Sequence, residues 1–150
     1  MNSEDIPRIL ELEDRLFDNA LAETQLLREL EVGYGKVFCK DGASDRPIGY
    51  MLVRPDRDVL DLTRLAVDPA AQGTGVGTLL LQSLYRDAQN MQRDVILTVL
   101  KNNRNALRLY LKHGFRVVGN LSGCAWVLRR EGERGPAWGP EVRPAASPCG

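Results

Sequence analysis

Residues 72–77 read Gln-Gly-Thr-Gly-Val-Gly and carry the clearest signal for binding chemistry in the chain. They follow a short apolar segment that ends at Asp68-Pro69, a pair typical of the exit from a strand. Because glycines lack a Cβ, consecutive backbone N–H groups of such a loop can face one anion. A helical pattern begins at Val76, and a helix N-terminus adds partial positive charge. This segment, called the cradle loop below (residues 72–78), therefore predicts a phosphate or pyrophosphate site.

The residue spacing of the cradle loop separates it from two common nucleotide-binding motifs. A Rossmann fingerprint needs Gly-x-Gly-x-x-Gly, and a Walker loop ends in Gly-Lys-Ser or Gly-Lys-Thr. The chain instead has Gln-x-x-Gly-x-Gly over residues 72–77, with no lysine in it. Taken alone, this pattern is also compatible with a glycine-rich turn from strand to helix that binds no ligand.

A second segment, residues 95–115, places a helix directly after an apolar strand. Residues 95–100 are rich in β-branched side chains and predict a buried strand. Asn102 or Asn103 then caps a helix that Gly114 ends. Within this helix Tyr110 lies four residues after Ala106, on the same face. The spaced residues of the segment are Asn103, Ala106, Tyr110, Gly114 and Phe115.

Together the two segments resemble the GNAT superfamily of N-acetyltransferases. Members of that superfamily carry Gln-x-x-Gly-x-Gly and, further on, Asn-x-x-Ala-x-x-x-Tyr-x-x-x-Gly-Phe. The resemblance covers roughly residues 3–130 and is closest to the branch that acetylates the N-terminal alanine of ribosomal proteins. It implies an α/β (α+β) fold with a mixed, mostly antiparallel sheet of about six strands, splayed in the middle and flanked by about four helices.

The activity that the resemblance implies is transfer of an acetyl group from acetyl-CoA, as cosubstrate, to a primary amine by direct attack in a ternary complex. The acceptor is a peptide N-terminus, a lysine or a small-molecule amine, and no metal is implied. A non-catalytic acyl-CoA-binding sensor or scaffold is the alternative.

The resemblance also assigns site residues. Backbone N–H groups near Leu65, Ala66 and Val67 polarise the acetyl oxygen, and Asn103 and Ala106 line the cofactor arm. The pyrophosphate is assigned to Gln72, Gly73, Thr74, Gly75, Val76, Gly77 and Thr78. Tyr110 is the predicted catalytic acid, because a phenol with a pKa near ~10 is protonated at neutral pH and can donate to a thiolate. The alternative is that Tyr110 packs in the core.

The general base is left open by the sequence. The related branch has a glutamate in a Leu-Glu-Val strand, where this chain has Leu97-Thr98-Val99. Asp58, Asp61 or a backbone carbonyl with ordered water could replace that carboxylate, and the substitution puts a peptide N-terminus as acceptor in question. His113 stands at a helix end, where a structural role is expected instead of catalysis.

Composition and charge narrow the class of protein. Lys+Arg and Asp+Glu both number 20 in 150 residues, so no net field attracts nucleic acid or an anionic membrane. A basic stripe is expected to be solvated or to meet an adenosine phosphate or an acidic substrate; it consists of Lys101, Arg104, Arg108 and Lys112. No apolar run reaches the ~18 residues of a membrane span. Cys39, Cys124 and Cys149 are typical of reduced thiols, which predicts a cytoplasmic protein.

Hydrophobic periodicity predicts the elements that position these residues. Helices are expected at 3–17, 23–30, 76–91 and 103–113, and strands at 35–40, 48–53, 59–67, 95–100, 115–119 and 125–129. Residues 1–130 form the predicted acetyltransferase domain. Residues 131–150, rich in Gly and Pro, predict a flexible tail whose Trp138 could touch the domain. Asn2 to Asp5 are already expected to form a helix cap, so the opening strand of the family is expected to be missing or truncated. The sheet edge that it would cover is then left exposed, which would favour a homodimer, or is covered by a partner.

Overall fold

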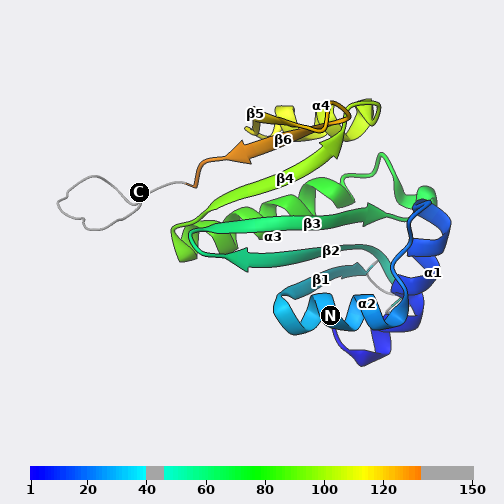
Figure 1. Cartoon of the computed structure of the whole chain (residues 1–150). Helices are drawn as coiled ribbons and strands as arrows, with labels where there is room; N and C mark the ends of the chain where they lie inside the picture. The colour runs from blue at the N-terminus through cyan, green and yellow to red at the C-terminus, as the bar shows by residue number, and fades with distance from the viewer. Residues whose placement is uncertain (40–45, 133–150) are drawn as a thin grey trace. The chain divides into compact units, whose positions relative to one another are not determined.

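The predicted α/β architecture is confirmed by a computed structural model, which describes residues 1–39 and 46–132. In these residues four α-helices accompany one open, six-stranded sheet with the order β1-β2-β3-β4-β6-β5 (Figure 1). Three of the strand pairs, β1–β2, β4–β6 and β5–β6, are antiparallel, whereas β3–β4 is parallel. The helices are α1 (Ile6–Leu16), α2 (Glu23–Val32), α3 (Val76–Met91) and α4 (Arg104–Lys112). The strands are β1 (Tyr34–Cys39), β2 (Pro47–Asp56), β3 (Val59–Val67), β4 (Asp94–Leu100), β5 (Arg116–Leu121) and β6 (Ala125–Arg130).

Most predicted boundaries lie within two residues of the observed ones. The first helix begins with a 3-10 turn, Ser3–Asp5, whose cap is the predicted Asn2. β5 extends past the predicted end at Gly119 because its pairing with β6 continues to the turn at Ser122-Gly123, where both residues have positive φ. The predicted turn at Asp41-Gly42, Trp138, Cys149 and almost all of the predicted tail lie outside the described residues.

Two compact units make up the chain. The first, called unit 1, comprises Met1–Pro55 and Leu62–Leu84, and the second, unit 2, comprises Asp56–Asp61 and Tyr85–Gly150. The predicted domain therefore extends over both units.

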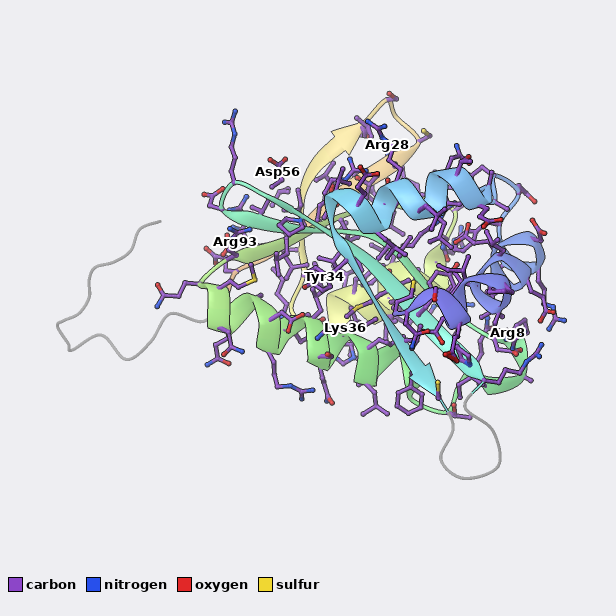
Figure 2. The ribbon with its side chains drawn as sticks, turned by 90° about the horizontal axis from the view of Figure 1, so that it is seen from below. Arg8, Arg28, Tyr34, Lys36, Asp56 and Arg93 are labelled. Carbon is purple, nitrogen blue, oxygen red and sulfur yellow. The ribbon has the colours of Figure 1, made fainter. Side chains whose placement is uncertain are left out.

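Unit 1 buries β2 on both of its faces. Tyr50 and Leu52 join the core formed with α1 and α2, while Gly49 faces the start of α3. A Cβ on Gly49 would lie 2.8 Å from Cγ1 of Val76, so only glycine allows this close approach. In Figure 2 helices α2 and α3 lie on opposite faces of β1 and β2, and Lys36 donates to Oγ of Ser83 on α3 at 2.6 Å. Because successive residues of β2 point to opposite faces of the sheet, one face of the strand packs on α1 and α2 and the other on α3.

The start of the chain contacts edge strand β1. The Met1 ammonium donates to the Gly35 carbonyl at 3.3 Å, and a Cβ on Gly35 would lie 2.8 Å from Cε of Met1. Met1 therefore contacts part of the sheet edge for which exposure or cover by a partner was expected. Blocking edge groups in this way limits strand pairing with other chains.

Unit 2 is organised around the β4–β6–β5 ladder. Leu97 and Leu128 stand opposite each other and are both buried. Asp94, at the start of β4, is 5% exposed and accepts hydrogen bonds from Nε of Arg129 at 2.7 Å and the N–H of Gly132 at 2.9 Å. No local sequence pattern indicates this partly buried ion pair, which ties the start of β4 to the end of β6.

Candidate functional site

The cradle loop has an open backbone. Gly73 and Gly75 have φ of +81° and +92°, values that favour glycine, and a Cβ at either position would meet no heavy atom within 4 Å. The first α3 hydrogen bond runs from the N–H of Leu79 to the carbonyl of Gly75 at 3.0 Å. The N–H of Thr74 donates to the Ala71 carbonyl at 3.3 Å, and the loop leads directly into the N-terminal turn of α3, the positive end of the helix dipole. The geometry fits an anion bound on the backbone.

Three predicted site residues use their side chains to shape this loop. The Gln72 amide donates to the Val67 carbonyl at 3.2 Å, and the Thr74 hydroxyl donates to the Ala71 carbonyl. Val76 is buried against β2. Gly77 and Thr78 follow in the first turn and are half-buried. The side chains of Gln72, Thr74 and Val76 thus hold the loop in place.

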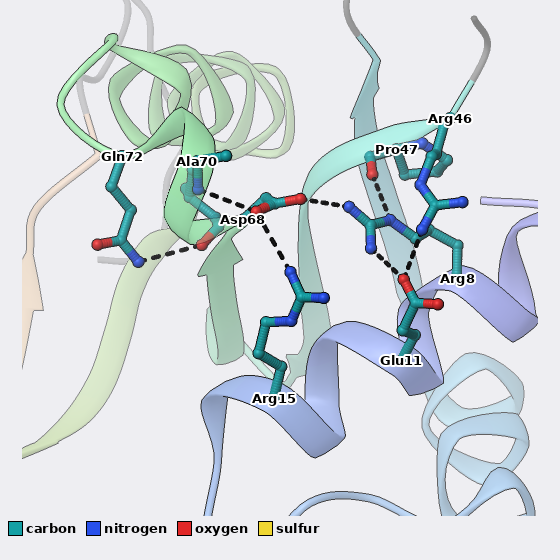
Figure 3. Close-up of polar contacts among 9 residues, drawn as sticks. Arg8, Glu11, Arg15, Arg46, Pro47, Asp68, Ala70 and Gln72 are labelled. Carbon is teal, nitrogen blue, oxygen red and sulfur yellow. Dashed lines mark hydrogen bonds and ion pairs between the residues drawn. The ribbon is translucent and has the colours of Figure 1, made fainter.

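Asp68 anchors the chain just ahead of the cradle loop (Figure 3). This carboxylate, 8% exposed, accepts the Ala70 N–H at 3.0 Å, pairs with Arg8 of α1 and lies 3.8 Å from Arg15. The Ala70 hydrogen bond, followed by Arg8 and Arg15, holds the pKa of Asp68 below its ordinary value. Arg8 also donates to the Pro47 carbonyl at 3.0 Å. The Asp-Pro pair signalled the local cap, but nothing in the sequence pairs Arg8 with a residue 60 positions away.

The predicted oxyanion segment forms the end of β3. Ala66 is 6% exposed and belongs to the core beside α1 and α2, whereas Leu65 and Val67 are half-buried. The carbonyl of Val67 is taken by Gln72. β3 therefore runs directly into the anchored loop of unit 1.

In unit 2, Tyr110 lies on a capped helix. Asn103 caps α4 by accepting the Ala106 N–H at 3.3 Å, as predicted. Tyr110 is 8% exposed and packs edge-on against Phe115, with 5.5 Å between ring centroids. Its hydroxyl has no hydrogen-bond partner within residues 1–39 and 46–132. Burial raises the pKa of Tyr110 to about 12, so the hydroxyl keeps its proton at neutral pH.

Arg130 holds the end of the same helix. Its Nε donates to the His113 carbonyl at 2.9 Å, and its guanidinium carbon lies 3.8 Å from the Tyr85 ring centroid. His113 ends α4, as predicted, and donates its N–H to the Tyr110 carbonyl at 3.0 Å. Burial, then Lys112 and Arg130, lowers the pKa of His113. The Tyr85 hydroxyl is buried without a partner in the described part of the chain, and burial raises its pKa. Arg130 and Tyr85 were not identified from the sequence.

Thr98, at the position of the missing glutamate, and the two aspartates that could replace that carboxylate are exposed or half-buried. Thr98 is exposed and stands opposite Val127 in the sheet. Asp58 is exposed in the turn that follows β2, and Asp61 is half-buried opposite Ile96. In the basic stripe Lys101 stacks on Trp126 at 4.0 Å, and its other members, Arg104, Arg108 and Lys112, are exposed. The general base therefore stays unassigned.

Membrane-spanning helices and clusters of metal ligands are both absent from residues 1–39 and 46–132. No helix in this part of the chain is long and apolar enough to cross a membrane. Within the same residues, no three His, Cys, Asp or Glu side chains gather as metal ligands would.

Comparisons with known proteins agree with the geometry. The sequence pattern of the acetyltransferase (GNAT) family matches residues 6–115. A peptidyl-lysine N-acetyltransferase of Escherichia coli is 32% identical over half of this chain and 46% of its own length. The chain spans less than half the length of the curated relatives it matches.

Solved structures show the same fold. The ribosomal-protein-S18-alanine N-acetyltransferase of Escherichia coli superimposes with a TM-score of 0.78 at 20% identity, covering 91% of this chain and 94% of that one. An N-acetyltransferase of Thermoplasma acidophilum in complex with coenzyme A has a TM-score of 0.74 at 17% identity, covering 87% and 95%.

Proposed function

The chain belongs to the GNAT family of acetyltransferases, and on that premise we propose that it transfers an acetyl group from acetyl-CoA to a primary amine. The observation that carries the proposal is the cradle loop. Its two positive-φ glycines, open on the side where a Cβ would stand, precede a long helix whose first turn offers N–H groups. A loop of this kind suits a pyrophosphate.

The residues present fit acetyl-CoA, which when bound supplies a thioester as acetyl donor. The backbone of residues 73–78 would hold the pyrophosphate. The backbone of residues 65–67 would bind the arm and polarise the acetyl oxygen, a contribution of about 3 kcal/mol to the barrier for one such donor. Asn103 and Ala106 are assigned to the same ligand. The acceptor nitrogen bonds to the acetyl carbon as the carbon–sulfur bond breaks, and its proton passes to water or to the unassigned base.

Tyr110 is proposed to donate a hydrogen bond to the departing sulfur. Its pKa of about 12 lies well above the ~8.5 of a thiol, so complete transfer of its proton is uphill. Donation without transfer still stabilises negative charge that develops on sulfur, in a site where the donor has no competing partner. The thiolate then takes its proton from solvent.

The test combines turnover and binding. Release of free thiol from acetyl-CoA should rise above hydrolysis with at least one amine of a panel containing peptide N-termini, lysine peptides and small amines. Tyr110→Phe keeps the ring packed and removes one hydroxyl, so turnover should fall at least tenfold while acetyl-CoA affinity, measured by calorimetry, stays within twofold.

Two outcomes would contradict these assignments. Acetyl-CoA binding without thiol release for any amine would favour the sensor or scaffold. Unchanged turnover in Tyr110→Phe would reduce Tyr110 to a packing residue while leaving the transferase intact.

A further inference from the structure

Unit 1 contains a cavity of about 400 Å³ that none of the assignments above uses. Its size is within the range of ligand sites. The α1–α2 connection, α2, β2 and β3 form its walls. The lining residues that carry the argument are Asn19, Glu29, Arg54, Thr63 and Arg64.

Arg64, in the wall of this cavity, already has several partners for its guanidinium. Its Nε and Nη2 each lie 3.2 Å from the carboxylate of Glu13, which is 0% exposed, and Nη2 also donates to the Asn19 carbonyl at 2.9 Å. The Phe17 ring centroid lies 4.2 Å from its guanidinium carbon. A buried pair with this many partners is costly to open, so Arg64 shapes the cavity and does not exchange partners.

The pair between Glu29 and Arg54 is different. The Arg54 side chain is 45% exposed and that of Glu29 is 19% exposed. Glu29 also accepts a long hydrogen bond of 3.4 Å from Thr63, whose hydroxyl lies 3.2 Å from the Leu52 carbonyl. An ion pair in contact with solvent contributes little to stability. Its two members can therefore take new partners at low cost, one anionic and one cationic.

We propose that this cavity binds the acceptor, and that its acceptors are amines with a carboxylate close by. The ammonium of the acceptor takes the place of Arg54 on Glu29, and its carboxylate takes the place of Glu29 on Arg54. Glu29 is the one carboxylate among the described residues that line the cavity, so the exchange leaves each charge paired. Free amino acids and peptides with an acidic residue near the N-terminus share this chemistry.

The position of the cavity on β3 connects it to the reaction, and the inference rests in this respect on the proposed function. Thr63 and Arg64 directly precede Leu65, where the arm of acetyl-CoA is proposed to bind. At about 3.3 Å per residue along a strand, Thr63 and Leu65 are about 7 Å apart, and Glu29, which would hold the amine, accepts a hydrogen bond from Thr63 at 3.4 Å. Glu29 and Arg54 would thus select the acceptor, and neither is proposed as the base that deprotonates it.

The test compares two peptide amides that differ only in charge, Ala-Glu-Ala-Ala-amide and Ala-Gln-Ala-Ala-amide. The reacting amine is the same in both. We expect kcat/KM to be about tenfold higher for the glutamate peptide, and Arg54→Ala to abolish that difference. Glu29→Gln should raise KM for both peptides. Arg28→Ala and Glu31→Gln, exposed positions on α2, are the matched controls and should leave both values unchanged.

A second readout needs no turnover. Calorimetric titration of each peptide into the protein with coenzyme A present should reproduce the preference and its loss in Arg54→Ala. Alanine and alaninamide, titrated in the same way, test free amino acids as acceptors. A preference for alanine over alaninamide, together with the preference for the glutamate peptide, assigns both free amino acids and peptide N-termini as acceptors. A preference found only among the peptides assigns peptide N-termini alone.

Equal binding of the two peptides, or a preference that persists in Arg54→Ala, would overturn the inference whether or not thiol is released. A preference in calorimetry with no thiol release from any amine would instead contradict the proposed function and leave the binding site standing.

Discussion

The cradle loop of unit 1 and Tyr110 of unit 2 differ in the kind of group that is proposed to contact the ligand: backbone in the first and a side chain in the second. In the cradle loop the proposed ligand surface is backbone, because the side chains of Gln72 and Thr74 donate hydrogen bonds to the Val67 and Ala71 carbonyls. At Tyr110 the proposed working group is one side-chain hydroxyl, which has no hydrogen-bond partner in the described chain and belongs to a ring that packs edge-on against Phe115.

The difference explains how each site tolerates change. A backbone site depends on the absence of Cβ atoms and on the anchors that hold the loop, so its sensitive positions are glycines and Asp68. A side-chain site depends on one atom and on the packing that aims it, so its sensitive positions are Tyr110 and the residues that hold the end of α4. Substitutions that affect only the backbone site, or only the side-chain site, therefore test this comparison.

The largest effect is expected from Gly75→Val. A branched Cβ in the open side of the loop would meet the phosphates, and acetyl-CoA affinity should fall about tenfold or more, equivalent to about 1.4 kcal/mol. Valine at φ +92° also strains the backbone. Gly123→Val, at φ +76° in the β5–β6 turn and likewise free of neighbours, is the matched control: it should lose similar stability but no affinity. Equal affinities of both variants in calorimetry would remove the cradle assignment.

A smaller effect is expected from Arg130→Ala. The His113 carbonyl would lose its donor and the Tyr85 ring its cation, so the helix end that carries Tyr110 would be less well held. Turnover should fall about threefold to fivefold, while KM for acetyl-CoA stays unchanged. Arg130→Lys should recover part of the loss. Arg116→Ala, whose side chain is 62% exposed, should behave as the parent; a comparable loss in Arg116→Ala would show that the effect is not specific.

The smallest effect concerns acid stability near the cradle loop. The folded-state pKa of Asp68 is lowered from 3.8, so its stabilising contribution is complete above about pH 4 and is lost as the pH falls through the lowered value. The drop in melting temperature between pH 6 and pH 3 should therefore be smaller in Asp68→Asn than in the parent. Asp14→Asn, an exposed position on α1, should retain the parental drop. A parental drop in Asp68→Asn would show that the Arg8–Asp68 pair adds no stability.

Features that depend on neighbouring residues were predicted from the sequence, whereas contacts between distant residues were not. The strand from Val59 to Val67 was predicted with its observed bounds, because its apolar run ends in an unambiguous Asp-Pro signal. The cap at Asn103 and the helix end at His113 were likewise predicted, since both depend on neighbours within four residues. Glu13, Arg64 and Asp94 were missed, because their partners lie far away in the chain and polar residues in amphipathic patterns are expected at the surface.

By itself, then, the sequence determined the elements, the family and the cradle loop, because glycine spacing, caps and periodicity act over a few residues. Only the tertiary structure decided which side chains hold the loop in place, that burial raises the pKa of Tyr110 above its ordinary value, and which ion pairs are buried or in contact with solvent. These properties depend on burial and on partners brought together by folding. Glu29 and Arg54, 25 residues apart, form a pair that no local pattern in the chain announces.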